Sequence, residues 1–399
     1  MFHHYRLRRA EMLDSCRVPE WMGPAFLAVA VVLLLGSDIA AAQPVGVPTL
    51  ANPADVQLAV EKGLFFVEHQ SMRWWKGHKC STCHEGQMLL VAANVAKSQG
   101  VPVDQKKLDF WTDRWVLTDA LSRKKDGYLN GLGIPTAPFV LLHRDIDRDM
   151  SVERSKKWAD LLRFALTWQG DDGSWTPKAA IVDLTPRMAL ALADIETSKM
   201  DLPKDLRQEI SESRKRTEEW IRSNEPQVPE KTESLAGWIT WEYQRGELAR
   251  AKKLLDELRS RRREDGGWGM RKDDPSHLLV TAVVLLALKT SGLPNDNPLV
   301  AETQRYLLSK QSADGRWREL GRHFHPEAYD DSYDAWTTGY AVAALSLTLP
   351  KLPPGKKRLF VPDPKLVKEV RQLTETAAMN YTGEPDRSGD PTQPERAKK

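Results

Sequence analysis

The chain has 399 residues, of which 41% are hydrophobic, enough for one large domain or two. Its 58 basic and 55 acidic residues leave a formal net charge of +3. This balance argues against nucleic acid as a partner, and we expect neither magnesium nor NAD as a cofactor.

Residues 1–42 have the pattern of a secretory signal. Four arginines precede an apolar run at residues 25–35, and three alanines at 40–42 follow it. The run is shorter than the ~20 residues that span a bilayer, and Asp38 interrupts it. The alternative is an uncleaved anchor, which would allow membrane association through this segment. In either case we expect export, to the periplasm or beyond. Cleavage would remove Cys16 and leave two cysteines.

Residues 43–55 form a Pro-rich and Ala-rich linker, and residues 56–350 contain six predicted helical pairs. Four second helices end before a proline, at Pro102, Pro203, Pro294 and Pro350. Less regular pairs occupy residues 104–147, with helices near 110–121 and 136–142, and residues 206–246, with helices near 209–223 and 233–244. In the tail, 351–399, we expect one helix at 366–379 followed by disorder.

The two helices of a pair differ in their hydrophobic pattern. Residues 248–258 place Leu248, Ala251, Leu254, Leu255 and Leu258 on one face and charges opposite, which predicts an outer helix. Residues 278–288 are apolar all round, as a helix buried on every side requires. Together these patterns predict an all-α fold, an α6/α6 toroid of six hairpins with inner and outer rings. An open superhelix is the alternative.

A repeated phrase links these helices, at residues 169–175, 262–268 and 311–317. Each copy has a Gly two residues before a Trp, at Gly173 and Trp175, Gly266 and Trp268, and Gly315 and Trp317. We expect the Gly to end the outer helix in the left-handed conformation and the Trp to pack against neighbouring outer helices. The amides of Gln169 and Gln311 should bind the backbone at an adjacent helix end. These residues are interpreted as structural clasps between repeats.

The phrase in its context, Tyr306 to Trp317, resembles the QW motif of squalene cyclases and of the wider prenyltransferase/squalene-cyclase toroid superfamily. The resemblance covers residues 56–350. It implies a toroid whose central cavity, in the family's enzymes, accepts isoprenoid chains. A lipid or isoprenoid ligand is therefore expected.

The family's catalytic motifs are matched only in part. Squalene-hopene cyclases protonate their substrate with an Asp-x-Asp-Asp motif, and residues 328–331 retain Asp330 and Asp331 but have Ala328 in the first place. Asp331 and Ser332 are also suitable N-caps for a helix at 333–347, the role expected of Thr185 and Ser276 in other repeats. The zinc site of protein prenyltransferases is excluded because no Cys follows Cys83.

The sequence Cys80-Ser-Thr-Cys83-His84 is the attachment motif of c-type haem, with two thioethers and His84 as axial iron ligand. Three alternatives remain. The cysteines could form a disulfide or a redox thiol pair. Zinc could bind His78, Cys80, Cys83 and His84, although this spacing is tighter than in zinc fingers. The short motif could also match by chance.

The motif coincides with the start of the first inner helix, expected at residues 85–97, where His84 takes the N-cap place. This puts a haem at one mouth of the toroid. For the distal ligand His277 is a candidate, Met88 is not expected to reach, and an open sixth position is the alternative. In this repeat the outer helix reaches Gln70, and Trp74, Trp75 and the motif are expected in the connection that follows.

Three functions follow from these observations. The first is an exported haem-c toroid that acts in electron transfer, with a redox partner protein, or in redox chemistry on a lipid-like ligand. The second is a terpenoid cyclase-like enzyme with Asp330 or Asp331 as the acid. The third is a non-catalytic binding scaffold.

Overall fold

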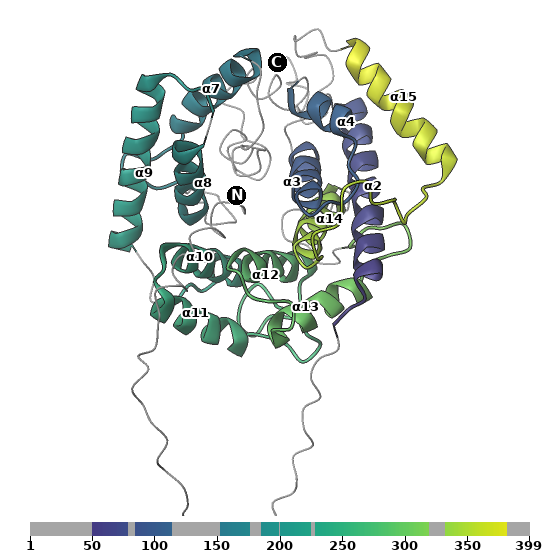
Figure 1. Ribbon diagram of the computed structural model, residues 1–399. Coiled ribbons are helices and arrows are strands. Elements are labelled where there is room, and N and C mark those ends of the chain that lie inside the picture. The colour runs from purple at the N-terminus through teal and green to yellow at the C-terminus, as the bar shows by residue number, and fades with distance from the viewer. Residues whose placement is uncertain are drawn as a thin grey trace, which may run out of the picture. The chain divides into compact units, whose positions relative to one another are not determined.

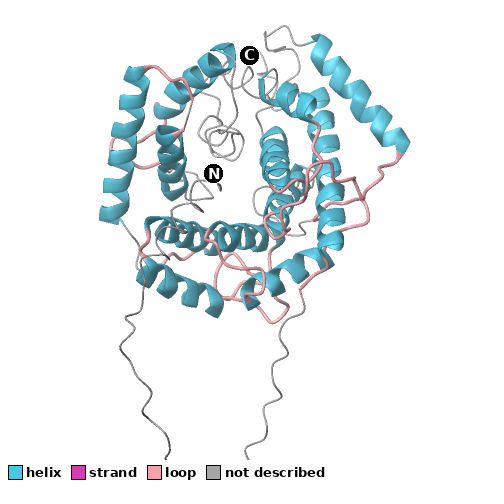
Figure 2. Ribbon diagram, in the orientation of Figure 1, coloured by secondary structure: helices cyan, strands magenta, loops and turns pink. Residues whose placement is uncertain are grey.

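The computed structural model describes residues 50–78, 84–113, 152–175, 185–198, 200–224, 228–318 and 332–380. Within these residues all regular secondary structure is helical, apart from two isolated bridges, Arg262 with Trp268 and Gln311 with Trp317 (Figure 2). Residues 50–399 form one unit. The predicted signal, 1–42, lies outside the described residues, as do residues 43–49 of the predicted linker, while α2 already begins at Pro53, within the expected linker.

Helices of the described residues alternate between an outer and an inner layer (Figure 1). The outer helices are α2 (Pro53–His78), α4 (Gln105–Phe110), α7 (Val152–Leu166), α9 (Lys204–Asn224), α11 (Leu248–Ser260) and α13 (Pro298–Ser309). The inner helices are α3 (His84–Ser98), α8 (Thr185–Thr197), α10 (Thr232–Arg245), α12 (Leu278–Thr290) and α14 (Ser332–Ser346). This arrangement confirms the predicted all-α toroid, with five of its hairpins in the described part of the chain.

The last hairpin packs against the first, which closes the two layers. The inner helix α14 contacts α12 on one side and α3 on the other, and it also contacts the outer helix α2. A Cβ at Gly63 of α2 would collide with Val342 of α14 and with Trp317, so a glycine permits this close approach. This contact between the first and the last hairpin favours a closed toroid over an open superhelix.

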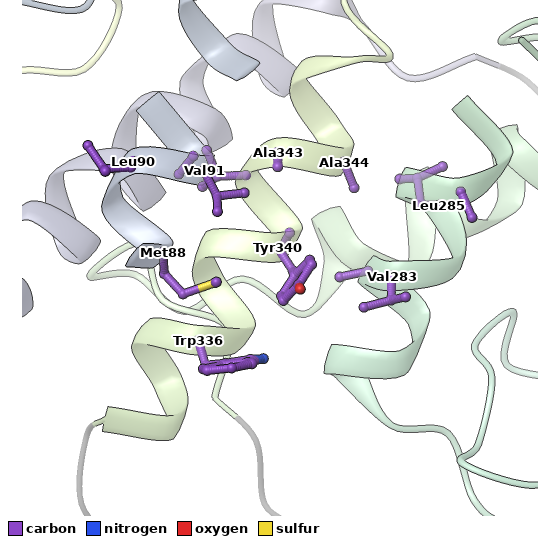
Figure 3. Packing of buried hydrophobic residues seen from close by; sticks show 14 of the residues in the cluster. Met88, Leu90, Val91, Val283, Leu285, Trp336, Tyr340, Ala343 and Ala344 are labelled. Carbon is purple, nitrogen blue, oxygen red and sulfur yellow. The ribbon is translucent and has the colours of Figure 1, made fainter. Parts of the chain in front are cut away.

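Burial follows the predicted difference between the layers. In α12 the side chains from Val280 to Leu285 are buried, whereas in α11 burial is confined to one face. Figure 3 shows Val283 and Leu285 of α12 facing Tyr340 and Ala344 of α14. The prediction that Leu248 belongs to the buried face of this helix is wrong, because Leu248 is 61% exposed. It is the first residue of α11, where the helix has no preceding turn to cover it.

Two outer helices have boundaries other than those predicted. Helix α2 continues past Gln70 to His78, so Trp74 and Trp75 belong to this helix and not to the connection. Helix α4 begins at Gln105 because Asp104 caps it by accepting hydrogen bonds from two backbone amides, and a π-helical turn continues it to residue 113. The predicted helix at 136–142 lies outside the described residues.

The C-terminal segment packs on the outside of α2. Helix α15 (Pro364–Asn380) contacts α2, in agreement with the predicted tail helix. Before it, the carboxylate of Glu61 accepts hydrogen bonds from the backbone amides of Leu359 and Phe360, both at 2.7 Å. We call residues 351–363 the strap.

Candidate functional site

Inner helices that are distant in the sequence are in contact within the unit. Gly339, near the middle of α14, lies against Met88 in the second turn of α3, and a Cβ at Gly339 would fall 3.2 Å from Met88 Cγ. Arg187, the third residue of α8, donates a hydrogen bond of 3.3 Å to the hydroxyl of Tyr340 in α14. We call the first turns of the inner helices, which include Arg187 of α8, the N-terminal mouth; Tyr340 lies near the middle of α14.

The Cys80–His84 motif directly precedes and includes the first residue of α3 in the chain. Helix α2 ends at His78, and α3 begins at His84, one residue before the predicted helix. Residues 79–83, and with them Cys80 and Cys83, lie outside the described residues, as does the side chain of His84. In the described part of the chain, no cluster of three or more His, Cys, Asp or Glu could hold a metal ion.

His277, the candidate distal ligand, and Met88, which was not expected to reach the iron, differ in their surroundings. Met88 is fully buried and points toward α14, so its sulfur belongs to the core (Figure 3). His277 is only 7% exposed, and its backbone is fixed because its amide donates to the carbonyl of Trp268 at 2.8 Å. Helix α14 lies between α12 and α3, so His277 and His84 come from inner helices that are not neighbours. A distal role for His277 stays a prediction.

Each Trp of the repeated phrase is held by a threonine of the following inner helix. The backbone amides of Trp175, Trp268 and Trp317 donate to the hydroxyls of Thr185, Thr281 and Thr338 at 3.1, 3.0 and 3.0 Å. All six side chains are buried. The indoles of Trp268 and Trp317 also donate to carbonyls of their own outer helices, at Leu258 and Leu307, so these two turns are tied to the preceding helix.

The Gln residues connect one repeat to the next outer helix. Gln169 donates to the carbonyl of Ser213 in α9 at 2.9 Å, and Gln311 donates to the carbonyl of Ala59 in α2 at 2.8 Å. Both acceptors lie within the helices and not at their ends. In the copy that has Arg in place of Gln, Arg262 pairs with Glu302 of α13.

The glycines of the phrase are left-handed but do not end the outer helices. Gly173, Gly266 and Gly315 have φ of +90°, +91° and +94°. Each amide closes a tight turn by donating to the carbonyl three residues earlier, and the outer helices end well before, at Leu166, Ser260 and Ser309. The expected helix-ending role is therefore wrong, and the glycine instead shapes the turn that presents the Trp.

The candidate acids Asp330 and Asp331 lie outside the described residues. The nearest described carboxylate in the sequence is Asp334, which is buried and paired with Arg316 at 3.2 Å. Ser332 is the first residue of α14. The expected cap at Ser276 is wrong, because His277 is the N-cap of α12 and the Ser276 hydroxyl donates to Asp265 at 2.6 Å.

A buried carboxyl at the mouth was not among the predicted site residues. Glu233, the second residue of α10, is 5% exposed, and neither carboxyl oxygen has a hydrogen-bond partner in the described structure. Burial raises the pKa of Glu233, opposed in part by its own backbone amide and by the charges of Lys231, Arg187 and Arg271. In the sequence Glu233 looks like an ordinary acidic residue in the first turn of a helix, and only the packed structure shows its burial.

The comparisons with known proteins agree with this architecture. Residues 236–314, which include α11, α12 and α13, match the family model of the squalene-hopene cyclase N-terminal domain. No curated protein gives a significant match to the chain. The helical repeats and the family match together support a squalene-cyclase-like toroid. Among the described residues, no helix combines the length and the apolar character needed to cross a membrane.

Proposed function

We propose that this protein is an exported squalene-cyclase-like toroid that carries a covalently attached c-type haem. Its role would be electron transfer, or redox chemistry on a lipid-like ligand. The observation that carries the proposal is the complete Cys80–His84 motif directly before the first inner helix. Two thiols followed at once by an imidazole are the donor set that haem c requires.

Each residue of the motif has a defined part in holding the group. Cys80 and Cys83 would form the thioethers, and His84 would ligate the iron. When bound, haem c supplies one-electron redox chemistry. His84 is also the first residue of α3, so the residue that would ligate the iron belongs to an inner helix.

The proposal is tested by producing the full chain in a host with haem-attachment machinery. We expect a pyridine haemochrome spectrum that stays with the polypeptide after acid-acetone extraction, and its loss in a Cys80→Ser, Cys83→Ser double variant. His84→Ala should keep the thioethers and change the spectrum of the iron. His78→Ala is the control. It should keep the thioethers and leave the spectrum of the iron unchanged, since His78 is outside the motif. A wild-type polypeptide without covalent haem contradicts the proposal.

A second candidate is a terpenoid cyclase-like enzyme, which the family match at residues 236–314 favours. Its acid would be Asp330 or Asp331, both beyond the matched residues. Incubation with squalene or shorter polyprenyl chains should then give cyclic products, and Asp331→Asn should abolish them while the helical content stays unchanged. If no product forms with any of these substrates, this candidate is wrong.

A further inference from the structure

Three polar side chains come from three different inner helices: Arg187 in the first turn of α8, Glu233 in the first turn of α10 and Tyr340 near the middle of α14. Arg187 reaches Tyr340 although α10 and α12 separate their helices in the inner layer, so this hydrogen bond crosses the interior (Figure 1). Glu233 lies close enough to Arg187 for their charges to interact. The Arg187–Tyr340 pair therefore faces the inside of the ring.

Among the described residues, Arg187 and Tyr340 have donors beyond the hydrogen bond that they share, and no acceptor is paired with these donors. The hydroxyl of Tyr340 accepts from Arg187, which leaves its own O–H free to donate. The guanidinium of Arg187 has further N–H groups, and a neutral Glu233 has one O–H. In the described part of the chain no other residue pairs with the buried carboxyl of Glu233, and burial of a polar group with so little compensation costs free energy, which a ligand could offset.

The charges near Glu233 and the aromatic and apolar side chains near Tyr340 indicate which class of ligand would fit. Beside Glu233, Lys231 and Arg271 add positive charge, although Arg271 is paired with Glu230 at 2.6 Å. Next to Tyr340, the ring of Trp336 lies 6.2 Å away, and Figure 3 shows apolar Val283 of α12 nearby. An acceptor group with negative charge would meet the donors, and an apolar body would meet the aromatic side.

We propose that Arg187, Glu233 and Tyr340 bind the carboxylate of a ligand that has an apolar chain. Arg187 supplies the charge-assisted hydrogen bond and Tyr340 donates a second, while Glu233 can donate a third only when its carboxyl carries a proton. The site lies outside the haem-attachment motif and does not depend on the haem. It adds to the proposed function a ligand class that the toroid would hold.

Calorimetric titration of the full-length protein, as purified, tests the site with three probes: decanoate, decan-1-ol and acetate. We expect decanoate to bind and decan-1-ol to bind at least about tenfold more weakly, because an alcohol cannot replace a charged acceptor. Acetate has a carboxylate but no apolar chain, so its binding shows whether the site recognises any small anion or requires the chain as well. Equal binding of decanoate and decan-1-ol, tighter binding of acetate, or no binding of decanoate overturns the proposal.

Variants separate binding from a structural role. Arg187→Met should weaken decanoate binding by at least about tenfold, whereas Arg163→Met, at an outer-layer ion pair with Asp205, should leave it unchanged. Circular dichroism checks that each variant is folded. If Arg187→Met is folded and binds decanoate as tightly as the wild type, the proposal is wrong.

The pH dependence gives a readout that a purely structural contact would not change. As pH rises through the raised pKa of Glu233, the carboxyl ionises and repels the ligand carboxylate, so wild-type affinity should fall. Glu233→Gln keeps a neutral donor at every pH, and its affinity should stay level over the same range. Measurements start above the ordinary pKa of a carboxylic acid, so that decanoate stays charged. A wild-type affinity independent of pH, or one that falls equally in Glu233→Gln, contradicts the assigned role.

Discussion

At the scale of single residues, the tryptophans of the repeated phrase depend on partners that the phrase does not contain. Trp175, Trp268 and Trp317 find their threonine hydroxyls 10, 13 and 21 residues further along. The phrase could be recognised in the sequence because its internal spacing is fixed. Its partners could not, because connections of different length separate them from it, and only the packed inner helix brings each hydroxyl to the Trp amide.

Thr281→Val should destabilise the protein by about 1–3 kcal/mol, because it leaves the buried amide of Trp268 without an acceptor while keeping the side-chain shape. Thr376→Val in α15 is the matched control. Its hydroxyl donates only to the carbonyl of Gln372 in an exposed contact, so the expected change is within about 0.5 kcal/mol. Urea unfolding followed by circular dichroism measures both. Equal changes in the two variants would mean that the Trp–Thr contact contributes little.

Glu233→Gln should alter how stability depends on pH. Unfolded Glu233 ionises near 4.5, whereas burial raises its pKa in the folded protein. Between these two values the folded state holds a proton that the unfolded state has lost. The free energy of unfolding of the wild type relative to Glu233→Gln should therefore fall as pH rises from 4.5 and level off above the folded pKa. A difference that stays constant with pH would contradict the burial of this carboxyl.

At the scale of elements, helix type was readable from the sequence and local junctions were not. The apolar run at 278–288 and the one-sided pattern at 248–258 identified α12 and α11 because burial on all sides or on one side leaves different periodicities. The end of α2 was missed because its helical pattern was expected to stop at Gln70, as in other repeats. The Cys80–His84 motif is visible in the sequence, but haem attachment stays a prediction because residues 79–83 lie outside the described residues.

The turns of the phrase give a prediction about how elements touch. A Cβ at Gly173 would overlap the carbonyl of Arg216 in α9, whereas at Gly266 the nearest atoms, in α13, are 3.7 Å away. Both positions have φ near +90°, so alanine costs about 1–2 kcal/mol at each. Gly173→Ala should cost at least about 1 kcal/mol more than Gly266→Ala, because it also forces the turn away from α9. Equal losses in urea unfolding would show that the turn and α9 can separate without cost.

At the scale of the whole unit, closure rests on contacts between the two ends of the described chain. Helix α14 packs on α3 and α2, and Gln311 binds the carbonyl of Ala59. The strap then covers α2 from outside, where Glu61 accepts two backbone amides. The number of hairpins in the sequence indicated a ring. The strap could not be predicted, because Glu61, the residue that holds it, looks like any other glutamate of an amphipathic helix.

Glu61→Ala should release the strap without opening the ring. Losing two hydrogen bonds to a charged acceptor, each worth about 1.5–3 kcal/mol, should raise the population of the open strap by at least about tenfold. Trypsin should then cut faster by a similar factor at Lys356, Lys357 and Arg358, which lie in the strap. Glu369→Ala is the control, because the contact of Glu369 with His69 at 3.2 Å is half exposed and should change cleavage by less than about threefold. Equal acceleration in both variants would mean that α15, and not Glu61, holds the strap in place.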